Sequence, residues 1–405
     1  MPPIRSRPTP WLLGKGCVRV LRLTSLSFAH PVVPSDRRAR LALPEHALRL
    51  AHRRLVTAGH EAFLLSTCLR VEIAWVGAPH AASELLAVLY GDGALAGLAQ
   101  VRPDEDAFRH LCRVAAGLES PLIGEPEVLG QFRRAVASYN ETPAASASLG
   151  RVLEAAIGVG RNGRRLIDHL PRGSLAAAAA AAAPLGRVAV LGAGSMARAT
   201  AEQLEGVEVS VFARRPGTVA GRNTLAWEAA VDAFAHYPVV ISTVPGKVPL
   251  FGDDVIVRAL ARRDEPLLLV DLGMPPGFPS PGADDPVRYL GIDELASSVD
   301  ARPSAVAAER IAKEAGATWR RLTASDRAGA VIAAMVGQGE EAVTDVVQRF
   351  AGRLAVADDP ERILRQVAHT VARRVLHRPI SFVGTSGRGT EAVDLLAEAF
   401  GIDDD

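Results

Sequence analysis

Short apolar segments alternate with helical patterns over the first 170 residues, which is typical of a small mixed α/β domain. Residues 18–23 alternate apolar and charged positions and predict a first strand. A helical segment follows, marked by the leucines Leu41, Leu48, Leu50 and Leu55. It leads into an apolar run at residues 62–65, so the order strand, helix, strand places Cys68 at a strand end.

Helical spacing covers residues 104–139, but Gly117 and the turn at Gly124-Glu125-Pro126 interrupt it. Polar groups therefore emerge between two helices, where they are candidates to line a pocket: Ser120, Glu125, Glu127 and Gln131. The alternative is an ordinary solvated helix face. A further helix is predicted over residues 146–166, and eight alanines at 176–183 predict a tightly packed or linking helix that ends at Pro184.

The next segment reads as strand, glycine turn, helix, strand, with the turn Gly192-Ala193-Gly194-Ser195-Met196-Ala197. In such a turn the first glycine makes the bend, the second lets the backbone approach a pyrophosphate, and Ala197 allows close packing of helix on sheet. Arg214 and Arg215 follow the second strand, where an NAD enzyme would offer an acidic residue. Paired arginines suit a 2′-phosphate, which favours NADP.

Three further strands continue this Rossmann sheet, over residues 239–245, 267–273 and 288–290, and the remainder of the chain reads as helix. The helical part has three apolar stripes: Ile311, Ala315, Thr318 and Leu322; Val343, Val346, Phe350 and Leu354; and Leu364, Val367, Val371 and Val375. Each stripe needs a partner surface. An oligomer interface satisfies this requirement, and a bundle within one chain is the alternative.

Composition changes this picture little. The chain has 405 residues, 48% apolar and 22% charged, enough for two or three globular domains. No apolar run approaches the roughly 20 residues that span a bilayer, so we expect no membrane segment, and residues 1–17 read as a disordered extension. Three cysteines without a CxxC pair argue against disulfides and structural zinc and fit a reducing cytoplasm. The net charge of +1 means that any RNA must be met by a local patch.

Cys68 is the candidate nucleophile. If the backbone is extended there, Cys68, Arg70 and Glu72 share one face of the strand. The guanidinium of Arg70 would then favour the thiolate form and could hold a substrate carboxylate with two hydrogen bonds. The alternative is a cysteine that merely packs in the interior.

Five motifs are spread over nearly the whole chain from Val18. They are Ser66-Thr67-Cys68-x-Arg70-x-Glu72, then His110-Leu111-x-Arg113-Val114-Ala115-x-Gly117-Leu118-x-Ser120, Gly124-Glu125-Pro126 with Gln131, the turn at residues 192–197, and Leu376-His377-x-Pro379. In this order and combination the sequence resembles the glutamyl-tRNA reductase family. The combination is specific, although no single motif is.

The resemblance implies an α/β chain of three domains. We expect an N-terminal α+β catalytic domain over residues 18–172, a central Rossmann NADP-binding domain over 173–298, and a C-terminal all-helical dimerisation domain on a long spinal helix over 299–405. Members of the family form V-shaped homodimers and use neither metal nor flavin.

The resemblance also implies a reaction. Cys68 would attack the ester of glutamyl-tRNA(Glu), and NADPH would reduce the resulting thioester to glutamate-1-semialdehyde, the first step toward 5-aminolevulinate and tetrapyrroles. His110 would support activity near Cys68, and glutamate-1-semialdehyde 2,1-aminomutase is a candidate partner. The glutamate pocket would be shaped by Thr67, Leu69, Arg70, Ser120, Glu125, Pro126, Glu127 and Gln131. Residues 192–197, with the arginines at 214 and 215, would hold NADPH.

Three departures from the family pattern matter. Leu69 stands where the family usually has asparagine, Glu127 where it usually has glutamine, and residues 164–168 lack the usual threonines. An added carboxylate weakens the binding of an anionic substrate unless it is paired. Two rival hypotheses follow: an inactive paralogue that binds tRNA or a pathway partner, and an unrelated NADP dehydrogenase of a free small acid. For His110, the alternative is an ordinary polar residue at a helix start.

Overall fold

The computed structural model describes residues 21–400 except for 124, 143–144, 168–173, 184–185, 247–249, 251–256, 259, 264, 279–286, 300–304 and 386–388. The predicted extension at residues 1–17 and the predicted domain boundary at 172–173 therefore lie outside the described residues. Two compact units are distinguished: residues 21–323, and a helical unit that begins at residue 324.

The N-terminal domain contains a four-stranded antiparallel sheet in the order β2-β3-β1-β4. Its strands are β1 (Leu23–Ala29), β2 (Ala62–Ser66), β3 (Arg70–Val76) and β4 (Gln100–Pro103). Of the predicted first strand at 18–23, residues 18–20 lie outside the described residues and residues 21 and 22 precede β1, which begins at Leu23. The serines and the threonine of β1 resemble loop residues in the sequence. β1 is nevertheless a central strand, and buried hydroxyls such as that of Ser27 have hydrogen-bond partners inside the sheet.

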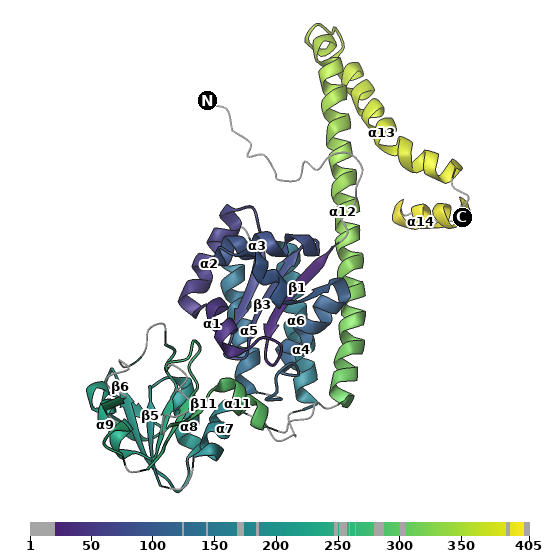
Figure 1. Ribbon diagram of the computed structural model, residues 1–405. Coiled ribbons are helices and arrows are strands. Elements are labelled where there is room, and N and C mark those ends of the chain that lie inside the picture. The colour runs from purple at the N-terminus through teal and green to yellow at the C-terminus, as the bar shows by residue number, and fades with distance from the viewer. Residues whose placement is uncertain are drawn as a thin grey trace. The chain divides into compact units, whose positions relative to one another are not determined.

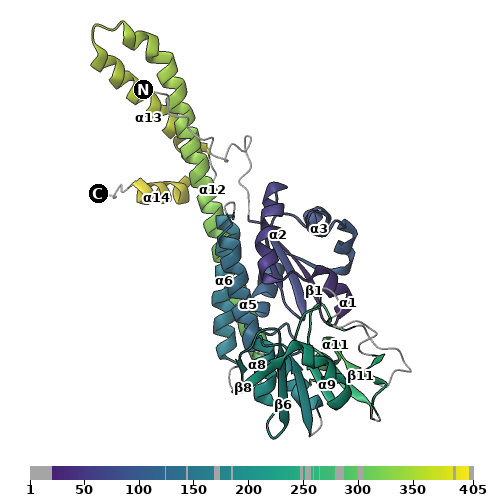
Figure 2. The same ribbon diagram turned by 90° about the vertical axis from the view of Figure 1, so that its left-hand side faces the viewer.

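Helices cover both faces of this sheet (Figure 1, Figure 2). On one side, α1 (Ser35–Leu41), α2 (Glu45–Thr57) and α3 (Ala82–Tyr90) pack on Leu26, Phe28 and Trp75. On the other side lie α4 (Asp104–Ala116), α5 (Pro126–Asn140) and α6 (Ala147–Arg165). The first predicted helical segment is two helices, since Pro44 separates α1 from α2.

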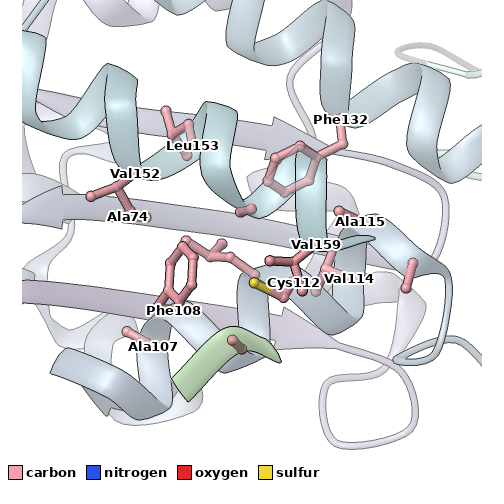
Figure 3. Close-up of a cluster of buried hydrophobic side chains, with 14 of the residues drawn as sticks. Ala74, Ala107, Phe108, Cys112, Val114, Ala115, Phe132, Val152, Leu153 and Val159 are labelled. Atoms are coloured by element: carbon pink, nitrogen blue, oxygen red, sulfur yellow. The ribbon is translucent and has the colours of Figure 1, made fainter. Parts of the chain in front are cut away.

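Figure 3 shows the core beneath α4, α5 and α6, where Phe108, Cys112, Phe132, Leu153 and Val159 meet. Cys112 is fully buried in this apolar cluster, so it packs as a small hydrophobe. The breaks predicted at Gly117 and before Pro126 are confirmed: α4 ends at a left-handed Gly117, and Pro126 opens α5.

The second domain of this unit is a seven-stranded sheet in the order β11-β10-β9-β5-β6-β8-β7. Its strands are β5 (Arg187–Leu191), β6 (Glu208–Ala213), β7 (Thr218–Val219), β8 (Arg222–Ala226), β9 (Val239–Ser242), β10 (Leu267–Asp271) and β11 (Val287–Leu290). All neighbours are parallel except β7 and β8. The β7–β8 hairpin was not predicted, because its residues are short, polar and largely exposed. The described helices of this second domain are α7 (Leu175–Ala182), α8 (Ser195–Gln203), α9 (Ala230–His236) and α11 (Ile292–Ser298).

The C-terminal part consists of α12 (Ala305–Ala355), α13 (Pro360–Thr385) and α14 (Gly389–Phe400). The first two predicted stripes lie on one helix, α12, which is 51 residues long. Its first turns pack on the N-terminal domain: Ile311 and Ala315 are fully buried, and Trp319 stacks on Phe108.

Within the distal unit, α13 is tied to α12 by polar pairs such as Arg374 with Asp345. An apolar row nevertheless stays exposed on α12: Val331, Ile332, Met335, Val336, Val343 and Val347. Contacts among the described residues therefore do not cover this face, as the oligomer hypothesis requires. No helix in the described part of the chain is long and apolar enough to cross a membrane.

Candidate active site

Cys68 lies at the tip of the tight turn that joins β2 to β3. The Thr67 amide donates to the Arg70 carbonyl at 2.8 Å, and the Thr67 hydroxyl accepts from the amides of Leu69 and Arg70 at 3.3 and 3.2 Å. The prediction that Cys68 shares a strand face with Arg70 and Glu72 is therefore wrong. The turn ends the alternation of side chains before Cys68 is reached, while Arg70 and Glu72 do share a face of β3.

A buried carboxylate, Glu72, organises the polar centre behind this turn. Its Oε1 accepts from Ser27 Oγ at 2.9 Å and from Arg70 Nη1 at 3.0 Å. Its Oε2 lies 2.9 Å from His110 Nε2. Burial acts to raise the pKa of Glu72, but the neighbouring His110 and Arg70 outweigh it and hold that pKa below its ordinary value. Glu72 is thus ionised at neutral pH.

His110 is fixed by this carboxylate. A carboxylate only accepts, so Nε2 of His110 donates to Glu72 Oε2, and in the neutral form of the ring the lone pair lies on Nδ1. Nδ1 has no hydrogen-bond partner among the described residues and lies 3.9 Å from Glu119 Oε2. His110 is 4% exposed on α4. His110 therefore lies in the middle of α4 and not at a helix start, and the Glu72 carboxylate orients its buried ring.

Arg70 is more fully engaged than its sequence suggests. Besides Glu72, its guanidinium donates through Nη2 to the backbone carbonyl of Glu119, and the side chain is 2% exposed. Both terminal nitrogens thus have acceptors within the protein. A substrate carboxylate would have to compete with these acceptors for Arg70.

The charges that act on the Cys68 thiol come from Arg38 and Glu125. Burial first, and the Glu125 carboxylate second, raise the pKa of Cys68 to about 12, while Arg38 acts to lower it. The prediction that Arg70 supplies the favourable positive charge is wrong, because Arg70 faces Glu72 behind the turn. The sequence did not single out Arg38, since a basic residue in an arginine-rich helix resembles a surface residue.

The four side chains predicted to line a polar pocket are all buried or half-buried. Ser120 and Glu125 are buried, which excludes the solvated-face alternative for both, and Glu127 and Gln131 are half-buried on α5. Burial, and after it the adjacent Glu127, raise the pKa of Glu125 to about 7. Arg70 and Arg164 act to lower this pKa but do not outweigh them. Glu125 is therefore about half protonated near pH 7. Gly124 lies outside the described residues.

Leu69 occupies an apolar cluster that also contains core residues of the Rossmann domain. It is 2% exposed and clusters with Leu122, Leu175 and Leu272. Cys68 packs at the margin of the same cluster. The leucine at position 69, where the family usually has asparagine, thus adds apolar contact between the domains. Because its side chain is buried in this cluster, Leu69 could contact a substrate only through its backbone.

Replacing Leu69 with asparagine is expected to lower the free energy of unfolding by about 1–3 kcal/mol, because an amide would be buried without partners in this cluster. Urea unfolding of the variant at pH 7 measures this loss. The half-exposed Val56→Asn on α2 is the matched control, and we expect it to cost less. An equal or larger loss in the control would contradict the buried contact.

The glycine turn of the Rossmann domain has the form that a dinucleotide requires. Gly192 has φ of 118°, and a Cβ there would lie 2.4 Å from Thr243 Oγ1, so only glycine fits. Ala193, Gly194 and Ser195 are exposed, and nothing lies within 4 Å of a Cβ placed on Gly194. Space for a pyrophosphate is thus available where α8 begins. Met196 is half-buried and Ala197 fully buried, in keeping with the predicted helix packing.

Arg214 and Arg215 are exposed directly after β6. The Arg214 guanidinium lies 5.4 Å above the Trp227 ring, which comes from the end of the unpredicted hairpin. Trp227 is a residue that sequence reasoning missed, because no motif marks it. The pair provides a cation and an aromatic surface where a Rossmann fold holds the adenosine half of its cofactor.

Comparison with known proteins places this site in a family. Residues 26–166 match the family described as glutamyl-tRNAGlu reductase, N-terminal domain, and residues 307–402 match its dimerisation domain. The chain is 32% identical to glutamyl-tRNA reductase 2 of Anaeromyxobacter sp. over 84% of this chain and 86% of that one. The chain belongs to the glutamyl-tRNA reductase family.

The chain is also similar to other glutamyl-tRNA reductases. Glutamyl-tRNA reductase of Pseudomonas paraeruginosa is 28% identical over 86% of this chain and 90% of its own length. Among solved structures, glutamyl-tRNA reductase from Methanopyrus kandleri aligns over 92% of this chain and 97% of its own, with 23% identity and a TM-score of 0.38. Membership in the reductase family confirms the predicted fold class and an oxidoreductase that uses a nicotinamide cofactor, and residues 307–402 are a dimerisation domain.

Proposed function

We propose that this chain reduces glutamyl-tRNA(Glu) to glutamate-1-semialdehyde with NADPH, the first step of the route to 5-aminolevulinate and tetrapyrroles. The observation that carries the proposal is the position of Cys68, a thiol at the tip of a turn that packs at the margin of the Rossmann core. A thiol of the N-terminal domain that packs beside the domain with the glycine turn supports Cys68 as the nucleophile.

In the first step, Cys68 Sγ attacks the ester carbonyl of the aminoacyl-tRNA. A carbon–sulfur bond forms, the carbon–oxygen bond to the terminal ribose breaks, and the tRNA leaves. Burial keeps the thiol protonated in the free protein, so its proton must pass to the departing ribose oxygen as the bond forms. His110 is the base we assign to relay this proton, because Glu72 leaves its Nδ1 free to accept.

In the second step, the Cys68 sulfur would leave as the thiolate when the thioester is reduced to the aldehyde, and bound NADPH would supply the hydride for this reduction. The exposed turn at residues 192–197 would hold the pyrophosphate, and Arg214 with Arg215 would bind the 2′-phosphate. The absence of an acidic residue after β6 supports NADPH over NADH.

The glutamyl group would be held by Thr67, Leu69, Arg70, Ser120, Glu125, Pro126, Glu127 and Gln131. Burial and, after it, the adjacent Glu127 raise the pKa of Glu125 to about 7. At pH 7 a protonated Glu125 can donate a hydrogen bond to a carboxylate. Ionisation of Glu125 at higher pH would remove this donor.

Arg214→Glu is expected to raise the KM for NADPH by about 10²-fold with little change in kcat, because it replaces a 2′-phosphate partner with a repelling carboxylate. Steady-state kinetics with NADPH and with NADH measure the effect. We expect the KM for NADH to stay within a few-fold of wild type, and an equal rise for both cofactors would contradict the assignment.

The test of the function is NADPH oxidation by the purified protein with glutamyl-tRNA(Glu), followed by identification of the semialdehyde. An inactive paralogue would oxidise no NADPH and form no glutamyl adduct on Cys68. A dehydrogenase of a free acid would oxidise NADPH with glutamate and no tRNA.

We also propose a homodimer in the cytoplasm, with the exposed apolar row of α12 at its interface. The aminomutase that uses the aldehyde is the proposed pathway partner.

A further inference from the structure

A buried arginine connects the catalytic turn to the Rossmann domain. Arg38 of α1 is 1% exposed, which requires that its charge be paired. Its Nη1 donates to the Val33 carbonyl at 2.5 Å, and its Nη2 donates to the Cys68 carbonyl at 3.4 Å and to Asp293 Oδ1 at 2.6 Å. One side chain thus contacts both the backbone of the nucleophile and an acid on α11 of the other domain.

Asp293 is held by three groups of the catalytic domain. Besides Arg38, it accepts from His30 Nδ1 at 3.1 Å and, through Oδ2, from the Ser35 amide at 2.7 Å. Burial acts to raise the pKa of Asp293, but hydrogen bonds from His30 and Arg38 outweigh it and hold this pKa well below its usual range. These pairs link segments more than 250 residues apart, so they are tertiary contacts between domains.

We propose that Arg38 and Asp293 form a latch that docks the Rossmann domain against the Cys68 turn, and that Arg38 positions Cys68 for hydride transfer. The proposal rests on the function proposed above and extends it to residues outside its site. A misplacement of the reacting groups by about 1 Å can cost on the order of 10²-fold in rate. Docking of the Rossmann domain against the Cys68 turn therefore controls the rate of hydride transfer. Attack on the ester uses groups of the catalytic domain and does not need the docked arrangement.

The charges around Cys68 allow a second test of the latch, which is the pH at which the Cys68 thiol reacts. Arg38 and Glu125 are the charged groups that act on its thiol, and Arg38 is shared with Asp293. Asp293→Asn removes the carboxylate and leaves the charge of Arg38 unshared, so it strengthens the action of Arg38 on the thiol. Cys68 should therefore react at lower pH in this variant.

The experiment measures two half-reactions and one pH profile in wild type, Asp293→Asn and Asp293→Glu. Release of tRNA without NADPH reports thioester formation, and single-turnover aldehyde formation reports hydride transfer. Iodoacetamide labelling of the Cys68 peptide, followed by mass spectrometry, gives the pH profile. Asp232→Asn, an exposed acid on α9, is the matched control.

We expect Asp293→Asn to slow hydride transfer on the order of 10²-fold while tRNA release stays within a few-fold. Labelling of Cys68 should move to lower pH, Asp293→Glu should restore both properties in part, and the control should match wild type. Equal loss of both half-reactions with an unchanged labelling profile would overturn the latch. Labelling needs no substrate, so it tests the latch even if wild type fails to reduce glutamyl-tRNA, a result that would instead reject the proposed function.

Discussion

Cys68→Ser is expected to abolish aldehyde formation, with a loss of at least about 10³-fold in kcat, and to leave NADPH binding unchanged. A serine hydroxyl ionises far less readily than a thiol, and the burial that already raises the pKa of Cys68 would suppress an alkoxide further. Any ester that formed on serine would accept hydride less readily than a thioester. Glutamyl-tRNA-dependent NADPH oxidation and a separate NADPH titration measure the two quantities.

The fully buried thiol of Cys112 provides the control for this change. Cys112→Ala removes a sulfur from the apolar core of α4, so it should cost about 1 kcal/mol of stability while the reaction continues. Semialdehyde production by the Cys68→Ser protein would contradict the thioester mechanism. Loss of NADPH binding in that variant would mean that the turn also shapes the cofactor site.

Glu72→Gln is expected to lower the free energy of unfolding by about 3–5 kcal/mol and to reduce activity on the order of 10²-fold. The change removes the charge that pairs with buried Arg70. It also presents His110 Nε2 with an amide that can donate, so the imidazole proton is no longer fixed on Nε2. Urea unfolding and single-turnover tRNA release measure the two effects, and the exposed Glu141→Gln is the matched control.

The same carboxylate predicts a pH dependence. Because the folded protein lowers the pKa of Glu72 from its ordinary 4.5, the stability it contributes is present above that value and is lost as pH falls through the folded pKa. Unfolding free energies between pH 7 and pH 3 should therefore fall more steeply for wild type than for Glu72→Gln. Parallel curves would contradict an ionised Glu72 at the centre of the site.

The sequence predicted the nucleotide-binding half of the molecule well, because its signals are local. The turn at residues 192–197 requires a glycine at Gly192 and a small residue at Ala197 whatever the rest of the chain does. The strands of a parallel sheet read as apolar runs for the same local reason. The β7–β8 hairpin and Trp227 carry no such signal.

The catalytic half was predicted less well, because its contacts join distant segments. Strand β1 was placed too early, since its buried serines resemble a loop until their partners in the sheet are known. Cys68 was placed on a strand face that the turn at Thr67 prevents. The charge near its thiol was assigned to Arg70, a sequence neighbour, whereas the folded chain supplies it from Arg38.

By itself, the sequence determined the reductase family, the order of its segments and the chemical groups available, because motif spacing and apolar periodicity are properties of the chain alone. The tertiary structure decided which of these groups act together. It paired His110 with Glu72 across 38 residues and Arg38 with Asp293 across 255. Burial and charge act through space, and spatial neighbours so far apart in the chain exist only once the chain has folded.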